Sequence, residues 1–115
     1  MYKFKVIITT EEETIQEEAI GSFLNGVISY QENNNTYVYL DINKDELIRE
    51  NDQILMKYAF KENRRSKGLI TIKEMNKELD IDIETTSLIK KDNYYYIEYK
   101  IEENKFIYEL SYTEE

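Results

Sequence analysis

Hydrophobic and polar residues alternate with period two along most of the chain, and short polar clusters interrupt the alternation. In the first segment, Phe4, Val6 and Ile8 share one face of an extended chain, with lysines on the other. Segments of this kind predict antiparallel strands joined by tight turns. About ten of them follow one another, at residues 2–9, 14–24, 27–31, 36–43, 46–50, 53–61, 69–75, 79–89, 94–101 and 105–113.

The polar clusters between these segments have the composition of β-turns. Asn25-Gly26 is the clearest of them, because both central residues of a type I′ hairpin turn take a positive φ. Residues 11–20 also show a faint helical period, so a helix stays open there as an alternative to a strand. Further turns are expected at residues 32–35, 51–52, 92–93 and 103–104.

Many short antiparallel strands in one sheet leave two edges that must be covered. The 115 residues are enough for one hydrophobic core and too few for two, and no linker divides the chain. Closure into a barrel removes both edges in a chain of this length. We therefore expect a single all-β domain over residues 1–115, an antiparallel β-barrel of about eight to ten strands, with a tightly packed sandwich as the alternative.

The composition excludes several kinds of chemistry. The chain contains no histidine and no cysteine, which excludes disulfides, thiol nucleophiles, imidazole bases, iron–sulfur ligation and ordinary zinc sites. An enzyme would have to use Asp, Glu, Lys, Tyr or a metal bound through oxygen, and the sequence shows no convergent set of these. We expect a protein that is not an enzyme and that holds no metal ion and no cofactor.

The balance of charge disfavours nucleic acids as partners. With 24 acidic and 15 basic residues the formal net charge is −9, so most of the surface would repel a phosphate backbone. The sequence shows neither a signal-peptide pattern at its start nor an apolar stretch of transmembrane length. We expect a cytoplasmic protein that binds no nucleic acid and no membrane.

Two acidic patterns have spacings that also occur in functional sites. Residues 41–52 place acidic side chains as in the calcium loop of an EF-hand, yet Glu46 stands where that loop needs a glycine. Asp80, Asp82 and Glu84 lie on one face of a predicted strand and alternate with aliphatic residues. Binary patterning therefore predicts that these three carboxylates are exposed to solvent and that neither pattern is a site.

The strongest concentration of positive charge is a basic loop at residues 61–68. Two adjacent arginines can bind a carboxylate or a phosphate in a bidentate manner, so this loop is the best polar candidate for a partner site. The alternative is a solvated loop that balances neighbouring Glu62 and Glu74. The candidate partner-binding residues are Lys61, Arg64, Arg65 and Lys67.

Eleven tyrosines and four phenylalanines give the chain a heavy aromatic content. On the inward strand faces these rings would either line a lumen that holds a small apolar molecule or fill that lumen, because a barrel of about eight strands is just wide enough for side chains. The candidate lumen residues are Met56, Tyr58, Phe60, Tyr95, Ile97, Tyr99, Phe106 and Tyr108. The side chains expected to be largely buried are Met56, Tyr58, Ile97, Tyr99, Tyr108 and Leu110.

Several segments, mostly in the second half of the chain, form a further pattern when taken together. They are Ile54-Leu55-Met56-Lys57-Tyr58, Arg64-Arg65-Ser66-Lys67-Gly68, Leu79-Asp80-Ile81-Asp82-Ile83-Glu84-Thr85-Thr86-Ser87-Leu88, Tyr96-Ile97-Glu98-Tyr99-Lys100-Ile101 and Phe106-Ile107-Tyr108-Glu109-Leu110-Ser111-Tyr112. From Ala19 onward the succession of segments resembles the YwiB-like family of uncharacterised bacterial proteins. The resemblance implies a calycin-like β-barrel, as in lipocalins, and brings no established activity with it.

The chain departs from that family at one point. A glycine-bearing loop often follows the basic segment in the family, and residues 72–76 of this chain contain no glycine. No ligand contact made by that loop is therefore transferred to this chain.

The sequence supports two alternative functions. The first is a non-enzymatic barrel that binds a small apolar ligand, supported by the barrel resemblance and the aromatic inward faces. The second is a protein-interaction module, as a homodimer or with another protein, which would use the basic loop and exposed tyrosines, because the run Tyr94-Tyr95-Tyr96 must send at least one ring to each strand face. An interior cavity of about 300 Å³ or more would favour the first, and a packed interior the second.

Overall fold

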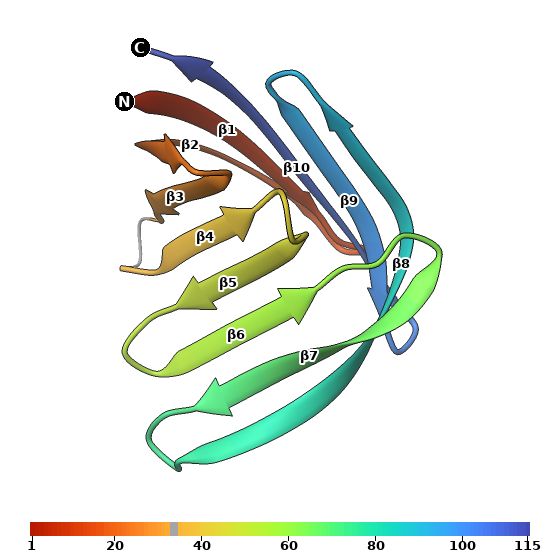
Figure 1. The fold of residues 1–115 in the computed structure, drawn as a ribbon. Coiled ribbons are helices and arrows are strands. Elements are labelled where there is room, and N and C mark those ends of the chain that lie inside the picture. Colours follow the sequence, from red (N-terminus) through yellow and green to blue (C-terminus); the bar gives the residue numbers. More distant parts are fainter. Residues whose placement is uncertain (33–34) are drawn as a thin grey trace.

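The computed structural model describes residues 1–32 and 35–115 and shows a closed β-barrel. Ten antiparallel strands follow one another around the barrel, and the first pairs with the last to close it (Figure 1). The strands are β1 (Tyr2–Thr9), β2 (Thr14–Leu24), β3 (Val27–Gln31), β4 (Tyr37–Asp41), β5 (Glu46–Glu50), β6 (Ile54–Ala59), β7 (Arg64–Ile72), β8 (Lys77–Lys91), β9 (Tyr94–Ile101) and β10 (Asn104–Glu114). The predicted antiparallel barrel is confirmed, and none of the described residues forms a helix capable of spanning a membrane.

Strand boundaries agree closely with the predicted segments over much of the chain. The segments 14–24, 27–31, 46–50 and 94–101 form strands with the predicted limits. Residues 14–20 lie in β2, so the strand is confirmed there and the helical alternative is wrong. The largest difference concerns β7, which begins at Arg64 and not at residue 69.

The basic loop predicted at residues 61–68 is wrong over its second part, because Arg64 to Gly68 belong to β7. These residues pair with β8, where Arg65 lies opposite Glu84 and Lys67 lies opposite Asp82. Cross-strand pairs of opposite charge stabilise a sheet. Arg65 and Lys67, which suggested a loop, therefore lie on the solvent face of a strand.

Most turns lie where the sequence predicts them, but the turn predicted at residues 103–104 lies at 102–103, because Asn104 begins β10. Asn25 and Gly26 have φ values of 53° and 80°, the two positive values that a type I′ turn requires. Asn51 forms its turn through the side chain, since its Oδ1 accepts hydrogen bonds from the backbone N–H groups of Gln53 and Ile54. Of the turn predicted at residues 32–35, positions 33–34 lie outside the described residues.

Strand direction gives the barrel two different ends. Because neighbouring strands are antiparallel, the turns after odd-numbered strands share one end, and the turns after even-numbered strands share the other with both termini (Figure 1). We call these the mouth end and the closed end. The mouth end carries the turns 10–13, 51–53, 73–76 and 102–103, and the closed end carries the turns 25–26, 42–45, 60–63 and 92–93.

The inward faces of the strands form an aromatic and aliphatic core. Phe4, Ile28, Val38, Leu40 and Ile97 are among its fully buried side chains. The burial prediction is confirmed for Tyr58, Ile97, Tyr99, Tyr108 and Leu110, while Met56 is half-buried. Asp80, Asp82 and Glu84 are exposed, as the alternation predicts.

A β-bulge in β8 changes which of its side chains face the interior. The register with β9 shifts between Thr85 and Ser87, and beyond the shift Leu88 and Lys90 lie opposite the buried Ile97 and Tyr95. An inserted residue of this kind exchanges the two faces of a strand. The bulge therefore places Lys90 on the inward-facing side of β8 at the closed end, where its side chain remains 43% exposed.

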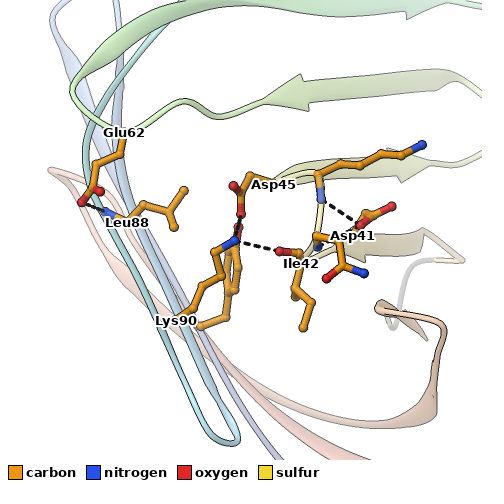
Figure 2. A network of polar contacts seen from close by, with 9 residues as sticks. Asp41, Ile42, Asp45, Glu62, Leu88 and Lys90 are labelled. Carbon is orange, nitrogen blue, oxygen red and sulfur yellow. Dashed lines mark hydrogen bonds and ion pairs between the residues drawn. The ribbon is translucent and has the colours of Figure 1, made fainter.

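Lys90 is held there by a polar network (Figure 2). Its Nζ donates to the Ile42 carbonyl oxygen and lies 2.9 Å from Oδ1 of Asp45. The hydroxyl of Tyr95 donates to the same carboxylate oxygen at 2.7 Å. These contacts tie β8 and β9 to the turn between β4 and β5, across the closed end.

Candidate functional site

A cavity of about 490 Å³ lies in the barrel at the mouth end. This volume is within the range of about 300 to 1,000 Å³ that ligand pockets occupy, so the aromatic side chains do not fill the lumen. Strands from both halves of the chain contribute to its walls. The aliphatic and aromatic part of the lining comprises Ile8, Ile15, Leu47, Met56, Tyr58, Tyr99, Ile101, Phe106 and Tyr108.

Five of the eight candidate lumen residues line this cavity: Met56, Tyr58, Tyr99, Phe106 and Tyr108. The other three, Phe60, Tyr95 and Ile97, are buried in the core and do not reach the cavity. The lumen is therefore hollow toward the mouth end and packed toward the closed end.

Three aromatic rings form a continuous wall of the cavity. Tyr99 and Phe106 are stacked, with ring centroids 5.3 Å apart and an interplanar angle of 17°. Tyr58 meets Tyr99 edge-on, at 6.1 Å and 71°. Aromatic pairs prefer these two arrangements, so strands β6, β9 and β10 together hold one aromatic wall.

An ion pair between Arg49 and Glu32 lies in the same cavity. Nη2 of Arg49 donates to Oε1 of Glu32, whose side chain is 5% exposed against 32% for the arginine. Burial alone would lower the pKa of the guanidinium, but the neighbouring Glu32 carboxylate outweighs burial and the pKa is raised. A guanidinium carries five N–H donors, so Arg49 can bind Glu32 and still donate to a molecule in the cavity.

Glu17 is the second carboxylate of the site. It lies opposite the buried Val6 in the ladder between β1 and β2, and so faces the interior. Burial raises the pKa of the Glu17 carboxyl, and the charge of Glu32 raises it further, against an opposing effect of Arg49. The charged lining thus consists of two carboxylates and one guanidinium.

Tyrosine hydroxyls supply the remaining polar groups. The hydroxyl oxygens of Tyr30 and Tyr108 are 2.6 Å apart and form a buried hydrogen bond. The hydroxyls of Tyr58 and Tyr99 have no hydrogen-bond partner within residues 1–32 and 35–115, although Tyr99 is only 8% exposed. Both residues line the cavity, so their hydroxyls can bond to a molecule inside it.

Glu17, Glu32 and Arg49 were not predicted as site residues, although the alternation contained the signal for two of them. Arg49 follows Leu47 by two positions, and Glu32 follows Tyr30 by two, which places each charge in register with buried residues. A charged residue on the apolar face of a strand needs a partner or a function.

The candidate partner-binding residues Lys61, Arg64, Arg65 and Lys67 are exposed and do not line this cavity. Nζ of Lys67 lies 2.5 Å from Oδ1 of Asp82. Arg65 lies opposite Glu84 in the ladder between β7 and β8, and both line a surface pocket together with Asp80 and Asp82. The structure therefore brings the basic residues of β7 together with the acidic face of β8.

A solved structure shares this fold over nearly the whole chain. The crystal structure of the ywiB protein from Bacillus subtilis superposes with a TM-score of 0.63 at 12% sequence identity, over 99% of this chain and 89% of that chain. The chain has the fold of YwiB. This finding agrees with the resemblance seen in the sequence, and the likeness to YwiB is one of fold. A scan against protein-family models finds no match, and neither does a search of the curated proteins.

The buried tyrosines predict how stability depends on pH. Burial raises the pKa of Tyr30, Tyr58, Tyr95, Tyr99 and Tyr108 above the ordinary value of 10.0. Above about pH 10 the unfolded chain loses these protons while the folded chain keeps them, so the folded state binds more protons and its stability falls with rising pH. We expect the free energy of unfolding in urea to fall steeply as the pH rises above about 10.

Tyrosinate absorbance in the native protein provides the control for this titration. The buried tyrosines should ionise only together with unfolding. Ionisation of all tyrosines in one step near pH 10, with the fold intact, would contradict the expectation.

Proposed function

We propose that the protein is a non-enzymatic barrel that binds a small, largely apolar molecule in the cavity at the mouth end. The observation that carries the proposal is the cavity of about 490 Å³ in a barrel whose other half is packed. Burial of apolar ligand surface against the aromatic wall would contribute about 25 cal/mol per Å². The hydroxyls of Tyr58 and Tyr99 would orient a polar group of the ligand.

The closed barrel supports this proposal because it prepares the site in advance. Most of the lining side chains come from strands that are paired on both sides, and the rings of the aromatic wall contact one another. A preorganised cavity costs little conformational entropy when a ligand enters.

The second hypothesis, an interaction module that uses the basic residues, receives less support. Lys67 is paired with Asp82, and Arg65 lies opposite Glu84. Charges that are compensated by neighbours on the same sheet attract a partner only weakly. We therefore place the functional site in the cavity and not at residues 61–68.

A matched pair of variants on β2 tests the proposal. Ile15 lines the cavity and is 40% exposed, whereas Ile20 is exposed on the outer face of the same strand. The variant Ile15→Trp adds bulk inside the mouth, and Ile20→Trp adds the same bulk outside. The probe is the neutral fluorophore N-phenyl-1-naphthylamine, whose emission rises in an apolar site. We expect Ile15→Trp to weaken its binding by about tenfold or more, and Ile20→Trp to leave the binding unchanged.

Thermal unfolding of both variants should show that the barrel remains folded. Absence of binding to the unmodified protein, or equal binding by the two folded variants, would overturn the proposal.

A further inference from the structure

We propose that the ligand of this cavity carries a positive charge, as an organic ammonium group attached to an apolar body. This inference rests on the proposed ligand-binding function and adds the sign of the ligand's charge. It follows from the charges in the lining, the charges around the mouth, and the aromatic wall.

Glu17 supplies the unbalanced charge of the lining. The charged residues that line the cavity are Glu17, Glu32 and Arg49. Arg49 and Glu32 are bonded to each other and together carry no net charge. No ion pair involving Glu17 occurs in the described part of the chain. A cation in the cavity would give this half-buried carboxylate the partner it lacks, and the gain is large because the surroundings are partly desolvated.

The turns around the mouth have the same sign of charge. Among the described residues of these turns the only basic one is Lys73, which is already paired with Glu50 at 2.7 Å. Lys77 and Lys105 lie at the mouth-end starts of β8 and β10, and Lys105 is paired with Glu98 at 2.7 Å. The turns at the closed end carry basic and acidic residues in similar number, namely Lys44, Lys61, Asp45, Glu62 and Asp92. The exposed acidic residues in the mouth-end turns are Glu11, Glu12, Glu13, Asp52, Glu74, Glu102 and Glu103. An opening whose surroundings carry an excess of one sign of charge concentrates ligands of the other sign.

The aromatic wall fits an organic cation better than a metal ion. No three carboxylates within residues 1–32 and 35–115 are arranged to hold a metal ion. Tyr58, Tyr99 and Phe106 present ring surfaces, which attract an ammonium group through their quadrupoles. The unpartnered hydroxyl of the buried Tyr99 can also accept a hydrogen bond from an ammonium N–H.

Binding of an anionic ligand is disfavoured because Arg49 is already paired. The guanidinium is the one cationic group of the lining, and Glu32 already occupies it. A ligand carboxylate or phosphate could displace Glu32 from Arg49, but the nearly buried Glu32 carboxylate would then lack its partner. Otherwise the ligand anion would have to lie beside both Glu32 and Glu17. Either arrangement adds like-charge repulsion in a partly desolvated site.

Three molecules with the same apolar body test the inference: octylamine, octanol and octanoate, each titrated by calorimetry at neutral pH. We expect octylamine to bind about tenfold tighter than octanol and octanoate to bind weakest. The variant Glu17→Gln should weaken octylamine by roughly fivefold and leave octanol unchanged.

The matched control is Glu18→Gln, because it makes the same change in net charge on the outer face of the same strand. Glu18 is exposed and lies 3.4 Å from Nζ of Lys3. This variant should bind octylamine as the unmodified protein does.

The outcomes separate the two proposals. If octanol or octanoate binds at least as tightly as octylamine, or if Glu17→Gln and Glu18→Gln behave alike, the charge inference is overturned and the ligand-binding function stands. If none of the three molecules binds, the charge inference is also overturned. The ligand-binding function then depends on whether N-phenyl-1-naphthylamine binds in a manner sensitive to Ile15→Trp.

Discussion

Replacement of Tyr108 with alanine should lower the free energy of unfolding by about 3 to 5 kcal/mol. The ring is buried between the core and the cavity, and its hydroxyl is hydrogen-bonded to Tyr30 at 2.6 Å. The substitution removes a large apolar side chain, enlarges a cavity that already exists, and leaves the Tyr30 hydroxyl without this partner. Urea denaturation of the two proteins measures the difference.

Tyr108→Phe is the control for this substitution. It keeps the ring and removes only the hydrogen bond, so we expect a loss of about 1 to 2 kcal/mol. A loss below about 1 kcal/mol for Tyr108→Ala would show that this residue does not support the barrel as its burial indicates.

Replacement of Arg49 with methionine should be nearly as damaging, with a loss of about 3 kcal/mol. Glu32 would remain almost fully buried without its cationic partner. Removal of one member of a buried ion pair costs more than the pair contributes, because the remaining charge is poorly solvated. The double variant Arg49→Met with Glu32→Met should therefore recover most of the lost stability.

Lys73→Met provides the matched control on the surface. Its partner Glu50 is exposed, so loss of that ion pair should cost no more than about 1 kcal/mol. If Arg49→Met costs as little as Lys73→Met, or if the double variant is no more stable than Arg49→Met, the ion pair in the cavity does not behave as a buried one.

Strand positions could be predicted from sequence where alternation and turn residues agree. β3 and β5 follow this rule, because each is a short alternating segment with turn residues on at least one side. The start of β7 could not be predicted in the same way, because charged residues occupy three of its first four positions, Arg64, Arg65 and Lys67. Their pairing with carboxylates of β8 depends on which strands become neighbours, and local composition does not contain that information.

The bulge in β8 had no signal in the sequence. Ile83, Thr85, Ser87 and Ile89 continue the period of two, and each is acceptable on an inward face. The register with β9 decides instead that Leu88 and Lys90 face inward. For the same reason, the sequence did not predict Lys90 as part of the closed end.

The residues that line the site could be predicted in part from the sequence, but the presence of a cavity could not. Aromatic residues on inward faces indicated the lining, and Met56, Tyr58, Tyr99, Phe106 and Tyr108 do line the cavity. Whether the lumen is hollow depends on how rings from opposite strands share its volume. Tyr99 and Phe106 stack on one wall and leave space in front of them, which no single strand pattern specifies.

The order of strands also bears on how the cavity comes to exist during folding. Every ladder except that between β1 and β10 joins strands that are consecutive in the chain, so most pairing proceeds through local hairpins. The closing ladder joins the two ends of the sequence, and loop-closure entropy opposes it. Ile8 and Phe106 lie on these two strands and face one cavity, which is therefore complete only after closure. A bound molecule would thus stabilise the closed barrel over the open sheet by mass action, and ligand occupancy would reduce the time that the edges of β1 and β10 are exposed.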